Sequence, residues 1–402
     1  MNPALKQVDT HGHRRLGRAF VVAQLAMSMV LVVAATLFVG TLVKLYAVER
    51  GFDSHGVLVV NVMSGRPYPA ARAMAVQGAL PERLRTMPGV RSASAAQILP
   101  VGGNQSFPTV QVEGYRFRSD ESEQVGFNVI APEYLATLGT PLLSGREFSD
   151  RDADTAPKVA TVNQSFARYF FGDGSALGRR VTHADVTYEV VGVVRDAKYQ
   201  SLRDSVPKTM YIPWMQHEGD QPSRYSYLAR TAAGDPLRLV PGLARLVRDA
   251  DPVLRVRAAM SYATVIDRSV ATERTMATLG GLFGLLALVV AGLGVFGVLA
   301  FQVARRTNEL GVRMALGASR WAMMRLVLHD LVGMLVAGVL IGGGVALMVT
   351  GVARKIVFGL TPTDPSVFVV AASVLAFAVV LGGWLPARRA SRVDPLVALR
   401  HE

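Results

Sequence analysis

Four long stretches without a charged residue constrain this chain more than any other feature of its sequence. They cover residues 19–43, 275–304, 331–353 and 365–387, and they are 25, 30, 23 and 23 residues long. Roughly 20 helical residues cross the hydrocarbon core of a bilayer. Core helices of a large soluble protein would be shorter and more amphipathic. We therefore predict four transmembrane helices.

The first apolar stretch follows three arginines, Arg14, Arg15 and Arg18, as the core of a secretory signal peptide would. The apolar core of a signal peptide is typically about 7–15 residues long and precedes a small-residue cleavage site. This stretch runs for 25 residues and ends in Lys44, Leu45 and Tyr46. Its length favours a retained membrane anchor.

Basic residues near the ends of the apolar stretches predict the orientation of the chain, because cytoplasmic loops carry an excess of Lys and Arg. Segments 1–18, 305–325 and 388–402 are all strongly basic. We expect all three, including both termini, to be cytoplasmic. Segment 354–364 is then a short extracytoplasmic loop, although it carries Arg354 and Lys355 against Asp364.

The segment between the first two spans, residues 44–274, must fold outside the lipid, and its patterning is mixed α/β. Alternating or β-branched runs predict strands, and helical periodicity predicts helices between them. The strands are expected at 57–62, 90–98, 109–112, 124–130, 159–162, 189–194, 209–212 and 226–230, and the helices at 71–86, 132–138, 164–171 and 236–251.

Two lobes are expected within this segment. The β-α-β patterns near 57–98 and 226–260 are predicted to pair, and residues from about 140 to 220 would form an inserted second lobe. The fold class is thus an α-helical membrane protein with four transmembrane helices plus a mixed α+β extracytoplasmic domain of two lobes. Residues 261–274 lack Gly and Pro, so they form either a stalk continuous with the second span or simply a long helix end.

The net charge of +13 does not indicate a nucleic-acid partner. Residues 44–274 hold 28 Lys and Arg against 24 Asp and Glu, so most of the excess lies beside the membrane spans. That distribution reflects topology and contact with anionic lipid. The chain has no Cys, which excludes disulfides and thiolate chemistry.

Motifs for catalysis are missing from the sequence. No Gly-Lys pair occurs, and a Walker A loop needs one to place its lysine at the phosphates. The seven histidines show no HExxH spacing, and no GxSxG motif is present. We expect no catalytic residue, metal or cofactor, and any ATPase activity must come from a partner. His329 and Asp330 fit an interfacial position better than a proton relay.

Glycine patterns within the spans predict close helix packing. Residues 292–297, GLGVFG, match the dinucleotide-binding fingerprint literally, but that motif requires a preceding strand and lies here inside a span. Two further pairs have the GxxxG spacing that brings membrane helices together. They are Gly280 with Gly284 and Gly338 with Gly342.

The loop after the second span predicts a short amphipathic helix at the membrane surface. Glu309 and Arg313 have favourable i,i+4 spacing. Leu310, Met314 and Leu316 form an apolar face that requires lipid headgroups or another protein as its partner. Residues 305–320 read RRTNELGVRMALGASR.

This run closely resembles the signature loop after the second transmembrane helix of MacB/FtsX-type ABC transporter permeases. The tail PARRASRVDPLVALRHE resembles their C-terminus, and LPERLRTMPGV, APEYLATLGTPLLSGREFSDRD, VNQSFARYFFGDGSALGRRV and YEVVGVVRDAKYQSLRD resemble their extracytoplasmic domain. The resemblance therefore covers nearly the whole chain. It implies a MacB-like core domain at 44–274 with a stalk, and an FtsX-like permease domain at 275–402.

The resemblance also implies a function. In this family the loop is a coupling helix that docks on an ATP-binding subunit, and dimer closure moves the extracytoplasmic domain. The coupling positions here would be Glu309, Gly311, Arg313, Ala315, Leu316 and Gly317. We expect a permease subunit in the bacterial inner membrane that exports or extracts an antibiotic, peptide, lipid or lipoprotein.

The partners implied by the resemblance are a cytoplasmic ABC ATPase, a second permease copy or sibling, and a periplasmic adaptor. MacB proper carries its ATPase on the same polypeptide, and no ATPase is recognised in this sequence. The region around the first span most resembles the second half of tandem-duplicated permeases. The alternative hypothesis is an FtsX-like signalling protein that regulates a periplasmic enzyme; the size of the extracytoplasmic domain favours transport.

Overall fold

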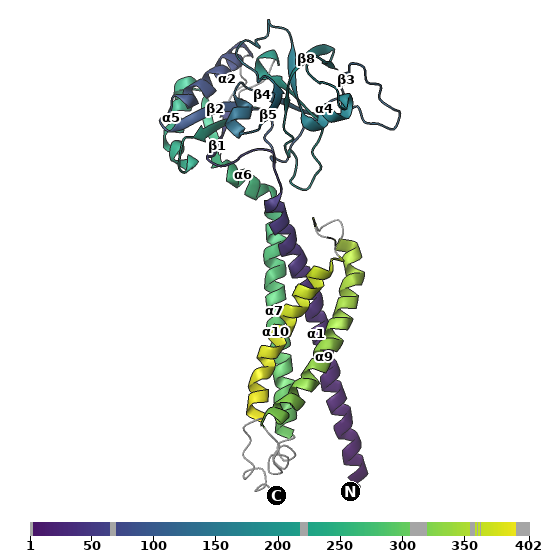
Figure 1. The fold of residues 1–402 in the computed structure, drawn as a ribbon. Helices are drawn as coiled ribbons and strands as arrows, with labels where there is room; N and C mark the ends of the chain where they lie inside the picture. The colour runs from purple at the N-terminus through teal and green to yellow at the C-terminus, as the bar shows by residue number, and fades with distance from the viewer. Residues whose placement is uncertain are drawn as a thin grey trace. The chain divides into compact units, whose positions relative to one another are not determined.

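A computed structural model describes residues 3–64, 70–217, 224–305, 320–353, 358–359, 361 and 363–390 (Figure 1). The chain divides into two compact units. One, the helical unit, comprises Met1–Ala47 with Thr272–Glu402, and the other, the α/β unit, is Val48–Ala271.

Four long helices in the described part of the chain form the helical unit. They are α1 (Pro3–Ala47), α7 (Ala271–Arg305), α9 (Arg320–Ala353) and α10 (Pro365–Ala390). Each contains a stretch long and apolar enough to cross a bilayer: Leu16–Ala47, Ala271–Arg305, His329–Val349 and Pro365–Pro386. The four predicted spans are confirmed.

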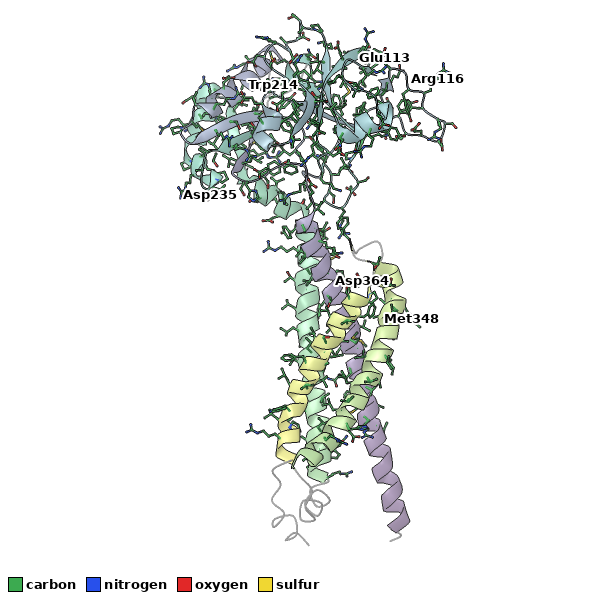
Figure 2. All side chains as sticks on the ribbon, in the orientation of Figure 1. Glu113, Arg116, Trp214, Asp235, Met348 and Asp364 are labelled. Carbon is green, nitrogen blue, oxygen red and sulfur yellow. The ribbon has the colours of Figure 1, made fainter. Side chains whose placement is uncertain are left out.

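Large apolar side chains lie on the outside of this unit. Met348, labelled in Figure 2, is 82% exposed, and Leu340 is 70% exposed. Inside the unit, Leu25, Val295 and Leu375 are fully buried. An apolar exterior is costly in water but matches lipid tails, which are as apolar as leucine.

The first half of the α/β unit is an antiparallel sheet with the strand order β11-β1-β10-β2. Its chain order is a split β-α-β arrangement of the ferredoxin-like type. The two predicted ends of the domain therefore do pair. The elements are β1 (Val57–Ser64), α2 (Ala70–Arg85), β2 (Val90–Ala96), β10 (Ser226–Thr231), η3 (Pro236–Leu239), α5 (Val240–Ala250) and β11 (Leu254–Ser261).

The second half is inserted between β2 and β10 and continues the sheet in the order β4-β9-β6-β8-β7-β3, with β5 beside β8. One register pair, Ala96↔Ile130, joins β2 to β4. The elements are β3 (Gln111–Val112), β4 (Gly126–Ile130), α3 (Tyr134–Leu138), β5 (Leu142–Gly145), β6 (Val159–Asn163), α4 (Gln164–Phe171), β7 (Arg180–His183), β8 (Val186–Val194), β9 (Thr209–Pro213) and η1 (Trp214–Gln216). The inserted lobe begins earlier than the predicted residue 140, because β3 pairs with β7 and β4 pairs with β9, both strands of this lobe.

Alternation along β1 divides the first half into two faces. Leu58, Val60 and Val62 enter the hydrophobic core that α2 and α5 complete with side chains such as Leu84 and Leu243. The intervening residues of β1 point to the opposite face. The short helix α6 (Tyr262–Ser269), which contacts β1 and β11, lies on that face.

A break at Val270 separates α6 from α7. Val270 has φ −108° and ψ 15°, outside the helical region, and α7 begins at the next residue. The hydroxyl of Ser269 donates to the carbonyl of Ile266 at 2.7 Å. This side-chain hydrogen bond competes with the backbone hydrogen bonds that would continue the helix. Both alternatives for residues 261–274, a continuous stalk and a long helix end, assume one unbroken helix, and the structure shows two helices instead.

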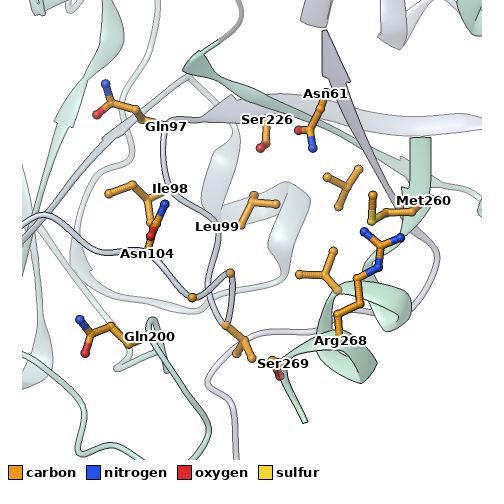
Figure 3. A pocket seen from close by; sticks show the side chains of 15 residues that line it. Asn61, Gln97, Ile98, Leu99, Asn104, Gln200, Ser226, Met260, Arg268 and Ser269 are labelled. Atoms are coloured by element: carbon orange, nitrogen blue, oxygen red, sulfur yellow. The ribbon is translucent and has the colours of Figure 1, made fainter. Parts of the chain in front are cut away.

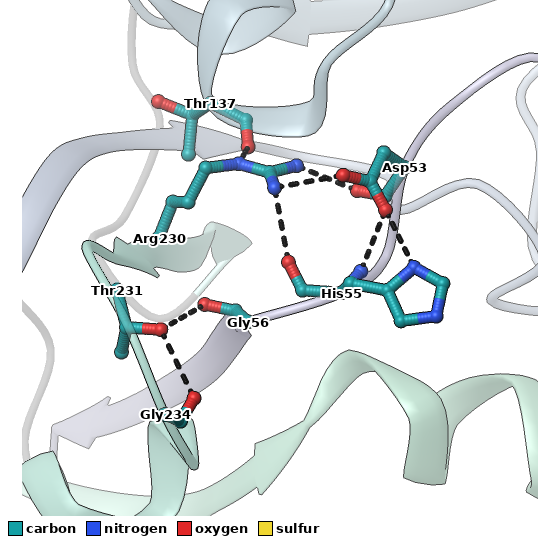
Figure 4. Close-up of polar contacts among 7 residues, drawn as sticks. All are labelled: Asp53, His55, Gly56, Thr137, Arg230, Thr231 and Gly234. Atoms are coloured by element: carbon teal, nitrogen blue, oxygen red, sulfur yellow. Dashed lines mark hydrogen bonds and ion pairs between the residues drawn. The ribbon is translucent and has the colours of Figure 1, made fainter.

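An arginine fixes the start of the α/β unit (Figure 4). Arg230 of β10 is 13% exposed and donates to the Thr137 carbonyl at 2.8 Å, the His55 carbonyl at 2.9 Å and the Asp53 carboxylate at 3.0 Å. Burial opposes the charge of Asp53, but hydrogen bonds from His55 and Arg230 outweigh it and lower the pKa of this carboxyl. The chain segment before β1 is thereby held against β10 and α3.

Candidate coupling loop and the helices that carry it

The predicted coupling loop connects the end of α7 at Arg305 to the start of α9 at Arg320. Every predicted coupling residue lies outside the described residues: Glu309, Gly311, Arg313, Ala315, Leu316 and Gly317. Their role stays a prediction. The structure describes what holds the two ends of the loop.

Three helices pack tightly near these ends. A Cβ added at Gly383 of α10 would lie 2.5 Å from Leu331 of α9 and 3.3 Å from Leu299 of α7. Beside the loop, the guanidinium of Arg305 lies 4.9 Å from the centre of the Phe301 ring, within reach of a cation–π contact. Gly383 of α10 thus allows α7, α9 and α10 to approach one another within the helical unit.

An ion pair joins α1 to α9. Arg18 contacts the carboxylate of Asp330, and the two side chains are 34% and 26% exposed. Charged groups within or beside membrane spans are normally paired in this way. Asp330 thus has an ionic partner on α1, and its interfacial position stays a prediction.

The four glycines predicted to pack helices lie against α1. A Cβ added at Gly280 or Gly284 of α7 would lie 3.0 Å from Phe38 or Ala35, respectively. On α9, a Cβ at Gly338 would lie 2.5 Å from Leu25, and one at Gly342 would overlap the carbonyl oxygen of Ala26. Real Cβ atoms essentially never approach another atom within 3.0 Å, so the contacts at Gly338 and Gly342 leave no room for a side chain, whereas those at Gly280 and Gly284 are merely tight. Their contribution to stability stays a prediction.

The fingerprint-like run 292–297 lies within the long helix α7, so no strand precedes it. Gly292 instead faces α10, where a Cβ added at Gly382 would lie 2.5 Å from the Gly292 carbonyl oxygen. The arrangement fits helix packing and lacks the strand-turn-helix geometry of a dinucleotide site.

Two polar side chains of α1 that we did not predict also reach α7. The Gln24 amide donates to the carbonyl of Val290, and the Ser28 hydroxyl donates to that of Ala287 at 3.1 Å. Gln24 and Ser28 are one helical turn apart in this span. Such spacing places them on one face, where polar groups hydrogen-bond between membrane helices.

Asp364 caps α10 by accepting from the Ser366 backbone at 2.9 Å, and this bond lowers the pKa of its carboxyl. No cluster of three or more His, Asp or Glu able to hold a metal ion occurs among the described residues.

Family models match both parts of the chain. Residues 22–274 match the MacB-like periplasmic core domain, and residues 281–395 match the FtsX-like permease C-terminal region. The chain belongs to the MacB/FtsX-type permease family. It is therefore a multi-pass membrane protein of the inner membrane, and its α/β unit is a MacB-like periplasmic core.

Curated relatives in this permease family are named as exporters. The chain is 28% identical over 320 residues to a pyoverdine export ATP-binding/permease protein, PvdT, of Pseudomonas syringae pv. syringae, covering 76% of the chain and 46% of the relative. It is 25% identical over 297 residues to the macrolide export ATP-binding/permease protein MacB of Wolinella succinogenes, covering 70% and 44%. The chain spans about half the length of these relatives.

A solved structure similar to the α/β unit is the periplasmic region of MacB from Actinobacillus actinomycetemcomitans. The match has 17% identity and a TM-score of 0.37, and it covers 54% of this chain and 92% of that one.

Proposed function

We propose that this permease couples ATP hydrolysis by a separate cytoplasmic ATPase to mechanical movement of its periplasmic domain, and that the movement exports or extracts a substrate. The observation that carries the proposal is the succession, along one chain, of a periplasmic core match at 22–274 and a permease match at 281–395. α7 follows the core directly and ends at the loop that resembles a coupling helix.

Three features support the expected partners. The sequence of the loop 305–320 predicts an apolar face and a Glu309–Arg313 pair, which would suit a protein surface. The lack of a Gly-Lys pair supports an ATPase site on a partner, because a Walker A loop needs that pair. We further propose that a second permease copy or sibling completes the assembly, with a periplasmic adaptor and membrane lipid as additional partners.

Two substitutions in the loop test the coupling. Glu309→Lys reverses a charge on the predicted docking face, and Gly311→Pro removes a backbone donor from the predicted helix. Both are expected to abolish permease-stimulated ATP turnover in a reconstituted complex while insertion into the membrane is retained. Glu123→Lys, an exposed acid of the α/β unit, is the matched control and should leave turnover unchanged.

Unchanged turnover with both loop variants would reject the coupling proposal. The FtsX-like match at 281–395 also supports a second candidate, a signalling protein that regulates a periplasmic enzyme. Co-purification separates the two functions. A pump adaptor in the complex supports export, whereas a cell-wall hydrolase supports signalling.

A further inference from the structure

A cavity of about 470 Å³ lies within the α/β unit, on the sheet face opposite α2 and α5 (Figure 3). Both lobes line it. One wall comes from β1, β10 and β11 with α6, and the other comes from the segment 97–104 and Gln200. This volume falls in the range of roughly 300–1,000 Å³ that is typical of small-molecule sites.

Two polar residues occupy paired positions on the sheet wall. Asn61 of β1 lies opposite Ser226 of β10 in the register, and both line the cavity. Asn is disfavoured in strands, and Asn61 interrupts a run of valines. Neither side chain hydrogen-bonds to another residue in the part of the chain that the structure describes. Their donors and acceptors are therefore available to a ligand.

One cation faces this space. Arg268 extends from α6 toward Met260 at the cavity wall (Figure 3), and within the described ranges its guanidinium forms no ion pair. No Asp or Glu is among the described residues that line the cavity. An arginine presents a planar fork of donors that binds a carboxylate through two parallel hydrogen bonds. The cavity therefore favours an anion.

The remaining lining narrows the class of anion. Amide side chains are frequent, with Gln97, Asn104 and Gln200 in addition to Asn61. Each amide offers a donor and an acceptor, which is the pattern a peptide group requires. Apolar side chains, including Val59, Leu99, Val265 and Met260, cover the rest of the wall.

We infer that this cavity binds a short peptide, or a peptide-like small molecule, that carries a free carboxylate. Arg268 pairs with the carboxylate, Asn61 and the neighbouring amides bind the peptide groups, and the apolar wall contacts a side chain of the ligand. Binding requires only the α/β unit. The inference therefore holds or fails independently of the ATPase coupling proposed above.

The test uses the full chain in lipid nanodiscs and two matched probes, N-acetyl-leucyl-leucine and its C-terminal amide, which lacks the charge. Isothermal titration calorimetry should show saturable binding of the acid. We expect the amide to bind about tenfold more weakly or worse, because it cannot form the charge-assisted hydrogen bonds that a carboxylate accepts from Arg268. Arg268→Gln should remove this difference, and Arg268→Lys should restore part of it.

Two further variants make the result specific. Arg245→Gln removes an exposed arginine of α5, on the other face of the sheet, and should bind both probes as the wild type does. Asn61→Leu should weaken both probes, because it removes an amide and fills space. Equal binding of acid and amide by the wild type, unaltered binding by Arg268→Gln, or no saturable heat with either probe would overturn the inference.

Discussion

A buried carboxylate orders the segment after β5. Asp152 has a side chain only 5% exposed and accepts two hydrogen bonds from Arg146, at 2.7 and 2.8 Å, and one from the Ser149 backbone at 2.9 Å. Burial opposes the charge of Asp152, but these hydrogen bonds outweigh it and hold the pKa of the carboxyl below its ordinary value. The ionised form therefore stabilises the fold.

Asp152→Asn is expected to lower the free energy of unfolding at pH 7 by about 2 kcal/mol, because it removes a charge-assisted pair. The pKa of Asp152 is lower in the folded than in the unfolded chain. Its contribution is therefore complete above the unfolded-state pKa of about 3.9 and disappears as the pH falls through the lower folded-state value. Unfolding monitored by intrinsic fluorescence should show the gap to wild type closing below about pH 4.

The control for this prediction is Asp173→Asn, because Asp173 is exposed. Its unfolding should match that of the wild type at each pH. A gap between Asp152→Asn and wild type that persists unchanged at acid pH would contradict the electrostatic explanation and indicate a loss of packing alone.

At the scale of elements, α1 is the helix that glycines of both α7 and α9 approach closely. Gly342 and Gly343 are neighbours on α9, yet only the first meets α1. A Cβ at Gly342 would overlap Ala26, whereas one at Gly343 would find no described atom within 4 Å. The same substitution at these adjacent positions therefore separates packing from helix propensity.

Gly342→Ala is expected to destabilise the helical unit, because α9 must move away from α1. Gly343→Ala should be neutral or stabilising, since Ala exceeds Gly in helix propensity by about 1 kcal/mol. Thermal unfolding of the two variants in detergent measures the difference. Equal unfolding temperatures would show that the close approach at Gly342 is unimportant.

Elements differed in how far the sequence could predict them. A charge-free run of more than 20 residues has a direct energetic meaning in lipid, so all four spans could be located. The short strands β5 and β7 were missed because most of their residues are not buried and show no apolar alternation. The break at Val270 carries no Gly or Pro to reveal it.

The candidate sites show the same limit. The coupling residues could be proposed because they are contiguous and resemble a family motif. Asn61 and Arg268 are far apart in sequence, and the fold alone brings them to one cavity. Gln24 and Ser28 carried a usable signal, their shared helix face, but nothing in the sequence identified α7 as their partner.

At the scale of the whole molecule, the proposed orientation places the α/β unit outside the cell's inner membrane and both termini in the cytoplasm. The chain contains no cysteine, so single cysteines can report this without background. Asp173→Cys lies on the α/β unit and Arg388→Cys lies near the end of α10, and both native residues are exposed.

A membrane-impermeant maleimide, applied to cells whose outer membrane admits it, should label Asp173→Cys directly. Arg388→Cys should react only after the inner membrane is permeabilised. Cysteine-free wild type is the control for unspecific labelling. The reverse pattern would contradict the orientation derived from the basic segments.

The first and last strands of the α/β unit are hydrogen-bonded neighbours, with Leu58 opposite Ser261 at the end where the chain enters and leaves. The chain connections before β1 and after β11 are the two covalent tethers of the domain. Because β1 and β11 are antiparallel, both tethers attach at the same end of this hydrogen-bonded strand pair, or ladder. Pulling the tethers apart would peel that ladder open one pair of bonds at a time, which is the mechanically weak direction. Equal displacement of both leaves it unloaded, so the movement proposed above would require the two tethers to advance together.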